Sequence, residues 1–306
     1  MAQRCAYGGE GGFEAARILP FLFGVLLLVG CATNKPAPAV KAPYFGPTEP
    51  MRQVIAEINR NNLAIRSIWA RHYYEATFLD EKKQPHFVNG DGILLFLKPM
   101  DLRLVGTKPA VGTVFEIGST AERYWMKVVP ETDTMWWGLY RNLGKPCVQE
   151  IPVRPDLILA VLGVSDIDTD FNQPPVPVMR FNPDEDAYMF LWSVHAPDRW
   201  IAQKEIWYDR VTKHPKMVLL FDDDGRVVLR AYLSKFVPVE TPDRPSDQWP
   251  VVATDYRLFF PDSRTKMSFE LSHVRTSNRG VPRAGSIRFP EEPGVSRVIQ
   301  IDKDCD

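Results

Sequence analysis

Apolar and polar residues alternate with a period of two along much of this chain, and this alternation constrains its fold more than any other feature. Residues 69–79 show it most clearly. Successive side chains of an extended strand point to opposite faces, so the pattern predicts a long strand with one buried face. That face carries Ala70, His72, Tyr74, Ala76 and Phe78, and Arg71, Glu75 and Thr77 lie on the other.

Similar segments recur at close spacing, with Gly, Pro, Asn or Asp in or beside most of the intervening turns. They predict about twelve strands, which form an antiparallel meander joined mostly by short hairpins. In the first half the strands are 69–79, 86–98, 101–107, 112–118, 123–129 and 134–140. In the second half they are 187–195, 200–210, 216–221, 226–237, 251–260 and 266–275.

Two segments predict helices. The first runs from a cap at Thr48, with Pro50 in its first turn, to about Arg66; its apolar face comprises Met51, Val54, Ile55, Ile58 and Ile65. The second is opened by Pro155-Asp156 and closed by Gly163. It is apolar all round, with Leu157, Ile158, Leu159, Ala160, Val161 and Leu162, so it must be buried or lie across an apolar surface.

Several of the predicted strands are apolar on both faces. In 187–195, Tyr188, Phe190, Trp192 and Val194 alternate with Met189 and Leu191. A sheet with water on one side does not need such a strand, so one face packs on a helix and the other bounds a cavity or a second layer. The fold class is therefore mainly β (α+β), with a single curved antiparallel sheet, an N-terminal helix and a mid-chain helix.

Residues 1–30 are typical of a bacterial lipoprotein signal peptide. Arg17 precedes an apolar run of about 11–12 residues, which is too short to span a bilayer. The run ends in Leu28-Val29-Gly30-Cys31, which resembles a lipobox, so we expect cleavage before Cys31 and acylation of its thiol. The alternative is a short core helix that happens to contain Cys31.

The segment 31–47 contains Pro36, Pro38, Pro43 and Pro47, with Ala and Lys between them. Such a segment favours an extended chain and predicts a tether that holds a folded domain, residues 48–278, off a membrane. Ala32, where Asp would favour retention in the inner membrane, points to the outer membrane. Residues 279–306 are expected to form an irregular tail.

Composition narrows the function. A cleaved chain would have 306 − 30 = 276 residues, enough for one large β domain. The net charge of −1 gives no basic footprint for nucleic acid. After cleavage and acylation, Cys147 and Cys305 remain; they either pair in an oxidising compartment or stay as thiols.

The order of elements, a lead helix, strands, one short apolar helix and strands again, resembles the LolA/LolB-like lipoprotein-carrier superfamily. Four stretches carry the resemblance between residues 48 and 278. They are Lys98-Pro99-Met100-Asp101-Leu102-Arg103-Leu104, then Phe115-Glu116-Ile117-Gly118-Ser119 with Tyr124-Trp125, then 155–163, and finally the closing hairpin from Trp249-Pro250 to Asn278.

The resemblance implies an incomplete β-barrel whose concave face, closed by helices, takes up acyl chains of lipids or lipoproteins. It also implies a periplasmic location, which Cys31 would make a lipid-anchored one at the outer membrane. The anchored receptor of the family carries an exposed Leu in a protruding loop. The corresponding turn here, Lys108-Pro109-Ala110-Val111, is short and has no Leu.

The candidate site follows from these expectations. Apolar area suffices to bind an acyl chain, at about 0.8 kcal/mol per buried CH₂, so we expect no cofactor, no metal and no catalytic residue. The mid-chain helix would act as a lid through Leu157, Ile158, Val161 and Leu162. The candidates for the cavity lining, each of which could instead be ordinary core, are Tyr74, Phe78, Leu104, Phe115, Trp125, Tyr188, Phe190 and Trp192.

Two other functions stay open: a membrane-tethered interaction module with a filled core that docks on an envelope partner, and a hydrolase. The sequence contains no Gly-x-Ser-x-Gly, His-Glu-x-x-His or P-loop motif. Asp222-Asp223-Asp224-Gly225 lacks the spacing of a calcium loop and predicts a solvated hairpin turn. The five histidines have no helical metal spacing, and His72 is expected to be a satisfied barrel histidine.

Overall fold

A computed structural model of the protein describes residues 42–79, 83–149, 151, 153–196, 198–242, 244–276 and 281–305. The chain divides into two units, Met1–Val40 and Lys41–Asp306, and the described residues belong to the second. The predicted signal peptide and lipidated Cys31 therefore lie outside the described residues, as does most of the tether. Among the described residues, no helix is both long and apolar enough to cross a membrane.

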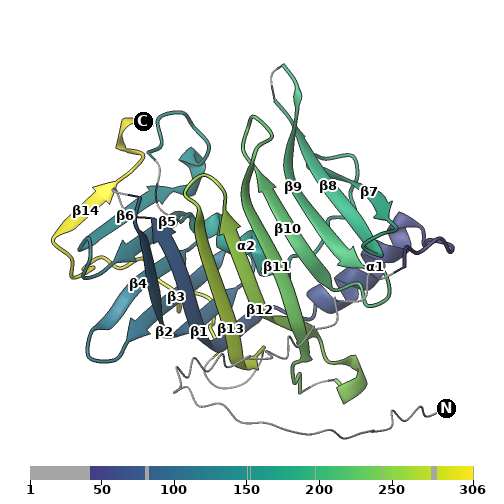
Figure 1. Ribbon diagram of the computed structural model, residues 1–306, viewed down its shortest axis with the longest axis horizontal. Helices are drawn as coiled ribbons and strands as arrows, with labels where there is room; N and C mark the ends of the chain where they lie inside the picture. The colour runs from purple at the N-terminus through teal and green to yellow at the C-terminus, as the bar shows by residue number, and fades with distance from the viewer. Residues whose placement is uncertain are drawn as a thin grey trace, which may run out of the picture. The chain divides into compact units, whose positions relative to one another are not determined.

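The described strands form one sheet of fourteen, in the order β14-β6-β5-β4-β3-β2-β1-β13-β12-β11-β10-β9-β8-β7 (Figure 1). Those of the first half are β1 Ser67–Leu79, β2 Pro85–Leu97, β3 Asp101–Lys108, β4 Gly112–Ser119, β5 Arg123–Val128 and β6 Thr134–Leu139. Those of the second half are β7 Val176–Asn182, β8 Ala187–His195, β9 Trp200–Asp209, β10 Pro215–Phe221, β11 Val227–Pro238, β12 Val251–Phe260, β13 Thr265–Arg275 and β14 Arg297–Gln300.

Two antiparallel meanders make up this sheet. One runs from β1 to β6 and the other from β7 to β13, and they join where β1 pairs with β13. Only β14 breaks the pattern, because it pairs in parallel with β6. The predicted fold class is confirmed: the protein is mainly β, with a single open, curved sheet that does not close into a barrel.

Two α-helices lie against the same face of the sheet, here called the inner face. They are α1 Met51–Asn62 and α2 Pro155–Val161; three short 3₁₀ turns are η1 Tyr140–Asn142, η2 Ser246–Gln248 and η3 Lys303–Cys305. Both α-helices contribute buried side chains to the main core, including Val54 and Ile58 from α1 and Ile158 and Val161 from α2. The opposite side of the sheet is called the outer face.

The start and end of α1 differ from the prediction. Pro50 is the N-cap and makes no side-chain cap, so the predicted cap at Thr48 is wrong. The helix ends at Asn62 rather than near Arg66, because the chain must turn to enter β1 at Ser67.

A buried lysine holds the start of α1 in place instead of a cap. The ammonium of Lys213 lies 2.6 Å from Glu49 and 3.5 Å from Glu57. Burial by itself lowers the pKa of Lys213, but the two carboxylates outweigh it and raise that pKa above its ordinary value. The ion pairs thereby fasten α1 to the turn between β9 and β10.

Glycines face large aromatic rings across neighbouring strands of the first meander. Each ring lies where a Cβ on the opposite glycine would stand, so any side chain there would collide with it. Gly106 faces the closest ring, since an added Cβ would be 2.1 Å from the ring of Phe115. The pairs are Gly90–Tyr74, Gly92–His72, Gly106–Phe115, Gly118–Trp125 and Gly138–Tyr124.

Two strands were missed by the sequence analysis. β7 falls between the mid-chain helix and residue 187, where no strand was predicted, and it contains Pro177. β14 falls within 279–306, so the expectation of an irregular tail is wrong for these four residues. Both are edge strands with one neighbour each, and few of their side chains are buried, so neither shows a regular apolar pattern.

The C-terminal segment covers the outer face of the first meander. Ile287, Phe289 and Val295 pack there with Trp125, Met135 and Trp137 in a second, smaller core. Beside it lies the buried carboxylate of Glu116, which accepts two hydrogen bonds from Arg103 and one from the indole of Trp125. The part of the sheet formed by β4 to β6 is thus packed on both faces.

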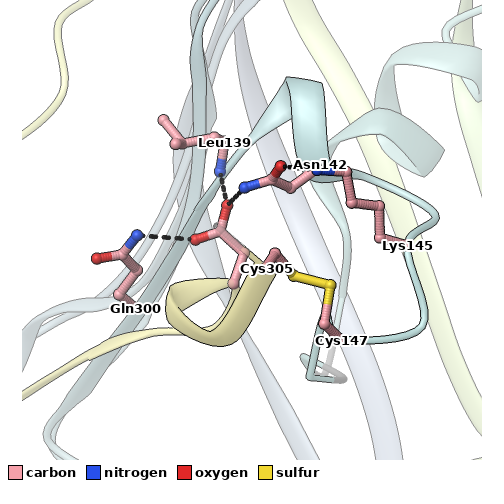
Figure 2. The surroundings of a disulfide bond; sticks show 7 residues. Leu139, Asn142, Lys145, Cys147, Gln300 and Cys305 are labelled. Carbon is pink, nitrogen blue, oxygen red and sulfur yellow. Dashed lines mark hydrogen bonds between the residues drawn. A yellow bond between two sulfur atoms is a disulfide. The ribbon is translucent and has the colours of Figure 1, made fainter.

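A disulfide fastens this segment. Cys147, after η1, is bonded to Cys305 in η3, which settles the alternative left open by the sequence (Figure 2). Next to it, the buried carboxylate of Asp302 accepts hydrogen bonds from the backbone of Leu139 and the side chains of Asn142 and Gln300. Burial by itself raises the pKa of Asp302, but these hydrogen bonds outweigh it and the pKa falls below its usual value.

The glycine–aromatic pairing predicts the effect of one substitution. Gly106→Ala forces the ring of Phe115 to move and is expected to lower the free energy of unfolding by about 1–3 kcal/mol, as overpacking does. Urea denaturation measures this. Phe115→Leu in the Gly106→Ala background should recover part of the loss, and Ser272→Ala on the exposed side of β13 should change little. A Gly106→Ala variant as stable as the parent would contradict the pairing.

Candidate functional site

The inner face of the sheet is a continuous apolar surface, and most of the predicted lining residues lie on it. Six of the eight belong to the main core: Tyr74, Leu104, Phe115, Tyr188, Phe190 and Trp192. Phe78 is half-buried near the end of β1, where its ring stacks on His86. The structure thus brings six candidates to one face, where they come from both meanders.

Trp125 is not among them. It is buried in the second core on the outer face, where its indole donates to Glu116. Its neighbour Met126 belongs to the main core on the inner face instead, because side chains alternate along β5. The interpretation of Trp125 as a lining residue is therefore corrected. Trp125 shares its face of β5 with Arg123 and Lys127, and it is buried there because the C-terminal segment covers it.

Helix α2 covers the middle of the inner face. Ile158 and Val161, together with Leu162 just after the helix, are buried, and Leu157 is half-buried. The hydroxyl of Tyr256 on β12 donates to the carbonyl of Leu162 at 3.3 Å. The helix is thus where the sequence predicts it. Three of its predicted lid residues, Ile158, Val161 and Leu162, are buried, and the fourth is partly exposed.

A small gap lies between α2 and the sheet. It has a volume of about 20 Å³, room for about one water molecule, and its lining is entirely apolar. Nine side chains surround it: Leu94, Leu104, Ile158, Val161, Leu162, Tyr256, Leu258, Phe269 and Leu271. In this conformation α2 fills the space that a ligand would need, so a larger ligand requires α2 to move.

Asparagines of α1 hold the segment after α2. The side chain of Asn59 pairs with the backbone of Ile167 in both directions, as donor at 2.8 Å and as acceptor at 2.8 Å. Asn62 donates to the carbonyl of Ser165, and Lys98 forms a 2.8 Å ion pair with Asp166. We call this set of contacts the lid clamp, because it joins the segment 165–167 to α1 and to the turn between β2 and β3.

Asn61, on the same helix, makes a matching pair elsewhere. It donates to the carbonyl of Val251 at 3.1 Å and accepts from the Val251 backbone at 2.7 Å. This pair joins α1 to the start of β12 and does not touch the segment after α2. No sequence pattern marks Asn59 or Asn61 for this role, because an asparagine side chain that pairs with distant backbone has no characteristic spacing.

Four buried polar atoms of the described residues have no hydrogen-bond partner, and all four come from aromatic side chains. They are His72 Nδ1 and the hydroxyls of Tyr74, Tyr124 and Tyr140. His72 Nε2 lies 3.1 Å from the carbonyl of Val105, so the histidine is only half satisfied. Burial lowers the pKa of His72 from 6.5 to about 4, and the ring is therefore neutral at pH 7.

Two further sequence predictions concern turns. Asp222 accepts hydrogen bonds from the backbone of Asp224 and Arg226, so Asp222-Asp223-Asp224-Gly225 is a hairpin turn between β10 and β11. The turn Lys108-Pro109-Ala110-Val111 joins β3 to β4, with Val111 half-exposed to solvent at 53%. Among the described residues no cluster of three or more His, Cys, Asp or Glu could hold a metal ion.

Comparison with known proteins gives neighbours by structure alone. No family model matches the chain, and no curated protein matches it. A DUF1329 family protein from Desulfovibrio piger has a TM-score of 0.48 and 10% identity, with 79% of this chain and all of the other covered.

Two further neighbours bear names from the superfamily that the sequence resembles. A LolA superfamily protein from Nitrosomonas europaea has a TM-score of 0.42 and 12% identity, over 74% of this chain and 93% of the other. A putative outer membrane lipoprotein-sorting protein domain from Vibrio parahaemolyticus has a TM-score of 0.41 and 10% identity, over 76% and 93%. Similarity at this level does not decide what the chain binds.

The buried histidine predicts a pH effect on stability. The unfolded chain binds a proton at His72 below pH 6.5, whereas the folded protein binds it only near pH 4, so stability falls as the pH drops through this window. The contribution lost by pH 4 is up to about 3 kcal/mol. Urea unfolding at pH 7 and 4.5 should show a smaller loss for His72→Gln than for the parent, while exposed His273→Gln should lose as much as the parent. An equal loss in all three would contradict this role.

Proposed function

We propose that this protein is an outer-membrane lipoprotein, anchored through Cys31 and facing the periplasm, that binds acyl chains of lipids or lipoproteins on the inner face beneath α2. The observation that carries the proposal is the gap lined only by apolar side chains under a short helix. Such a surface recognises a hydrocarbon chain without any polar constellation. The disulfide supports an oxidising compartment such as the periplasm.

The small volume of the gap does not oppose binding, because an acyl chain can replace the helix. Moving α2 exposes Ile158, Val161 and Leu162, at about 1.5–3 kcal/mol each or about 5–9 kcal/mol together. Burying about twelve CH₂ groups returns about 10 kcal/mol. The two quantities are of similar size, so α2 acts as a lid that an acyl chain displaces and that closes again when the chain leaves.

A second function is favoured by the filled core itself. With α2 seated and a gap of only about 20 Å³, the protein also suits a membrane-tethered module that docks on an envelope partner. Native mass spectrometry of protein purified from bacterial membranes distinguishes the two functions. A lipid adduct of the folded protein supports the binder, and a mass free of adducts supports the docking module.

Ligand binding is tested with the full-length chain carrying Cys31→Ser, so that no acyl anchor competes. The neutral apolar dye N-phenyl-1-naphthylamine should brighten on binding with a stoichiometry near one, and dodecanol should displace it, because both enter the apolar space under α2. Fluorescence titration measures both. Absence of brightening at any protein concentration would refute acyl-chain binding.

The lid is tested by the two matched asparagines. Asn59→Ala removes two hydrogen bonds of the lid clamp and should speed dye uptake about thirtyfold in stopped-flow fluorescence, since each bond contributes about 1 kcal/mol. Asn61→Ala removes an equivalent pair from the same helix, together with a 3.0 Å bond to the side chain of Asn62, but removes no contact with the segment 165–167. Equal uptake rates in both variants would show that α2 does not gate the inner face.

A further inference from the structure

Lys204 on β9 points toward the apolar inner face. Ile206 and Tyr208, two and four residues further along β9, are both buried in the main core, and side chains two residues apart share a face. Lys204 therefore lies on the inner side of the sheet, next to Trp192 of β8 and Leu220 of β10 in the strand register. Its ammonium sits 4.7 Å from the centre of the Trp192 ring.

No carboxylate is recorded against this ammonium in the part of the chain that the structure describes. β8 and β10 contain no acidic residue, and the two acids of β9 are engaged elsewhere. Glu205 faces the other side of the sheet and accepts from the indole of Trp207, and Asp209 accepts from the backbone of Val211 and Thr212. Several other half-buried cations have acidic partners, among them Lys98 with Asp166, Lys127 with Glu116 and Arg210 with Asp186.

Burial leaves the ammonium of Lys204 poorly solvated and lowers its pKa below the ordinary value. By contrast, acidic neighbours raise the pKa of Lys213 and of Lys235. An anion next to Lys204 would therefore gain a charge-assisted hydrogen bond in a setting with little competing water.

An apolar path connects Lys204 with the gap under α2. Leu258, which lines the gap, is paired across the strands with Ala231, then Val218, then Ile206, and all four are buried. Three strand spacings across the sheet and one step of two residues along β9 are perpendicular to each other, so the straight-line distance from Leu258 to Lys204 is about 16 Å. That is close to the length of the acyl chains of one leaflet, about 15 Å or half of the bilayer hydrocarbon thickness.

We propose that Lys204 binds the anionic headgroup of the amphiphile whose acyl chain lies under α2. This inference rests on the proposed function and names its ligand class: a lipid with a carboxylate or phosphate beside its hydrocarbon chain. The chain follows the path from Leu258 to Ile206, and the headgroup reaches the ammonium of the half-buried Lys204 in the middle of β9. Trp192 holds the lysine in place by its cation–π contact.

The test compares ligands that share one chain length. Displacement of N-phenyl-1-naphthylamine from the full-length Cys31→Ser chain is measured with dodecanol, dodecanoate and dodecyl phosphate, and inorganic phosphate alone serves as a fourth titrant. Both anionic amphiphiles should bind about tenfold more tightly than dodecanol. The better of the two identifies the headgroup source, and displacement by inorganic phosphate alone would refute an amphiphile site.

Variants assign the effect to this residue. Lys204→Met keeps the apolar stem and should abolish the preference for the anionic ligands while dodecanol binds as before, and Lys204→Arg should retain the preference. Lys266→Met, on an exposed position of β13, should behave like the parent. The inference is overturned if Lys204→Met keeps the preference, or if the parent binds dodecanoate no better than dodecanol. Failure of dodecanol itself to displace the dye would instead refute acyl-chain binding as such.

Discussion

Burial of the inner face by two short helices is the constraint on which this structure depends. A single sheet of fourteen strands has no second sheet to pack against, and its inner face carries most of the buried apolar side chains. Among the residues that the structure describes, the twelve of α1, the seven of α2 and the segments beside them cover it. The cover is therefore thin, and its position depends on a few polar contacts, the ion pairs of Lys213 and the amides of Asn59, Asn61 and Asn62.

The two meanders are stabilised in different ways. β4 to β6 have a core on each face, and the outer one is supplied by the C-terminal segment and secured by the disulfide and by Asp302. The outer face of β11 to β13 instead carries polar side chains such as Asp255, Glu270 and Lys235, which pair with one another. The first meander thus forms a rigid wall, and the site we propose extends from it toward the second meander, where Lys204 lies.

The alternation of residues was enough to predict twelve of the strands and the open antiparallel sheet. Apolar segments bounded by Pro and Gly signals predicted the two helices. Each of these follows from local patterns in the sequence. It could not predict that the distant C-terminal segment buries Trp125 on the face of β5 that also carries Arg123 and Lys127. The partners of Asn59 and the isolation of Lys204 depend on the register between strands far apart in the sequence. Neither the lid clamp nor the position of Lys204 on the inner face therefore has a sequence pattern that could have been recognised before the fold was known.

The two strands that the sequence did not reveal are also the two that end the sheet. An open sheet exposes unpaired backbone groups at each edge, and a second copy of the chain can add a strand there. β14 offers only four residues, and β7 contains a proline, which cannot donate to a new neighbour. The irregular composition that made these segments hard to recognise as strands is thus what protects a wide, single-layered protein from edge-to-edge aggregation.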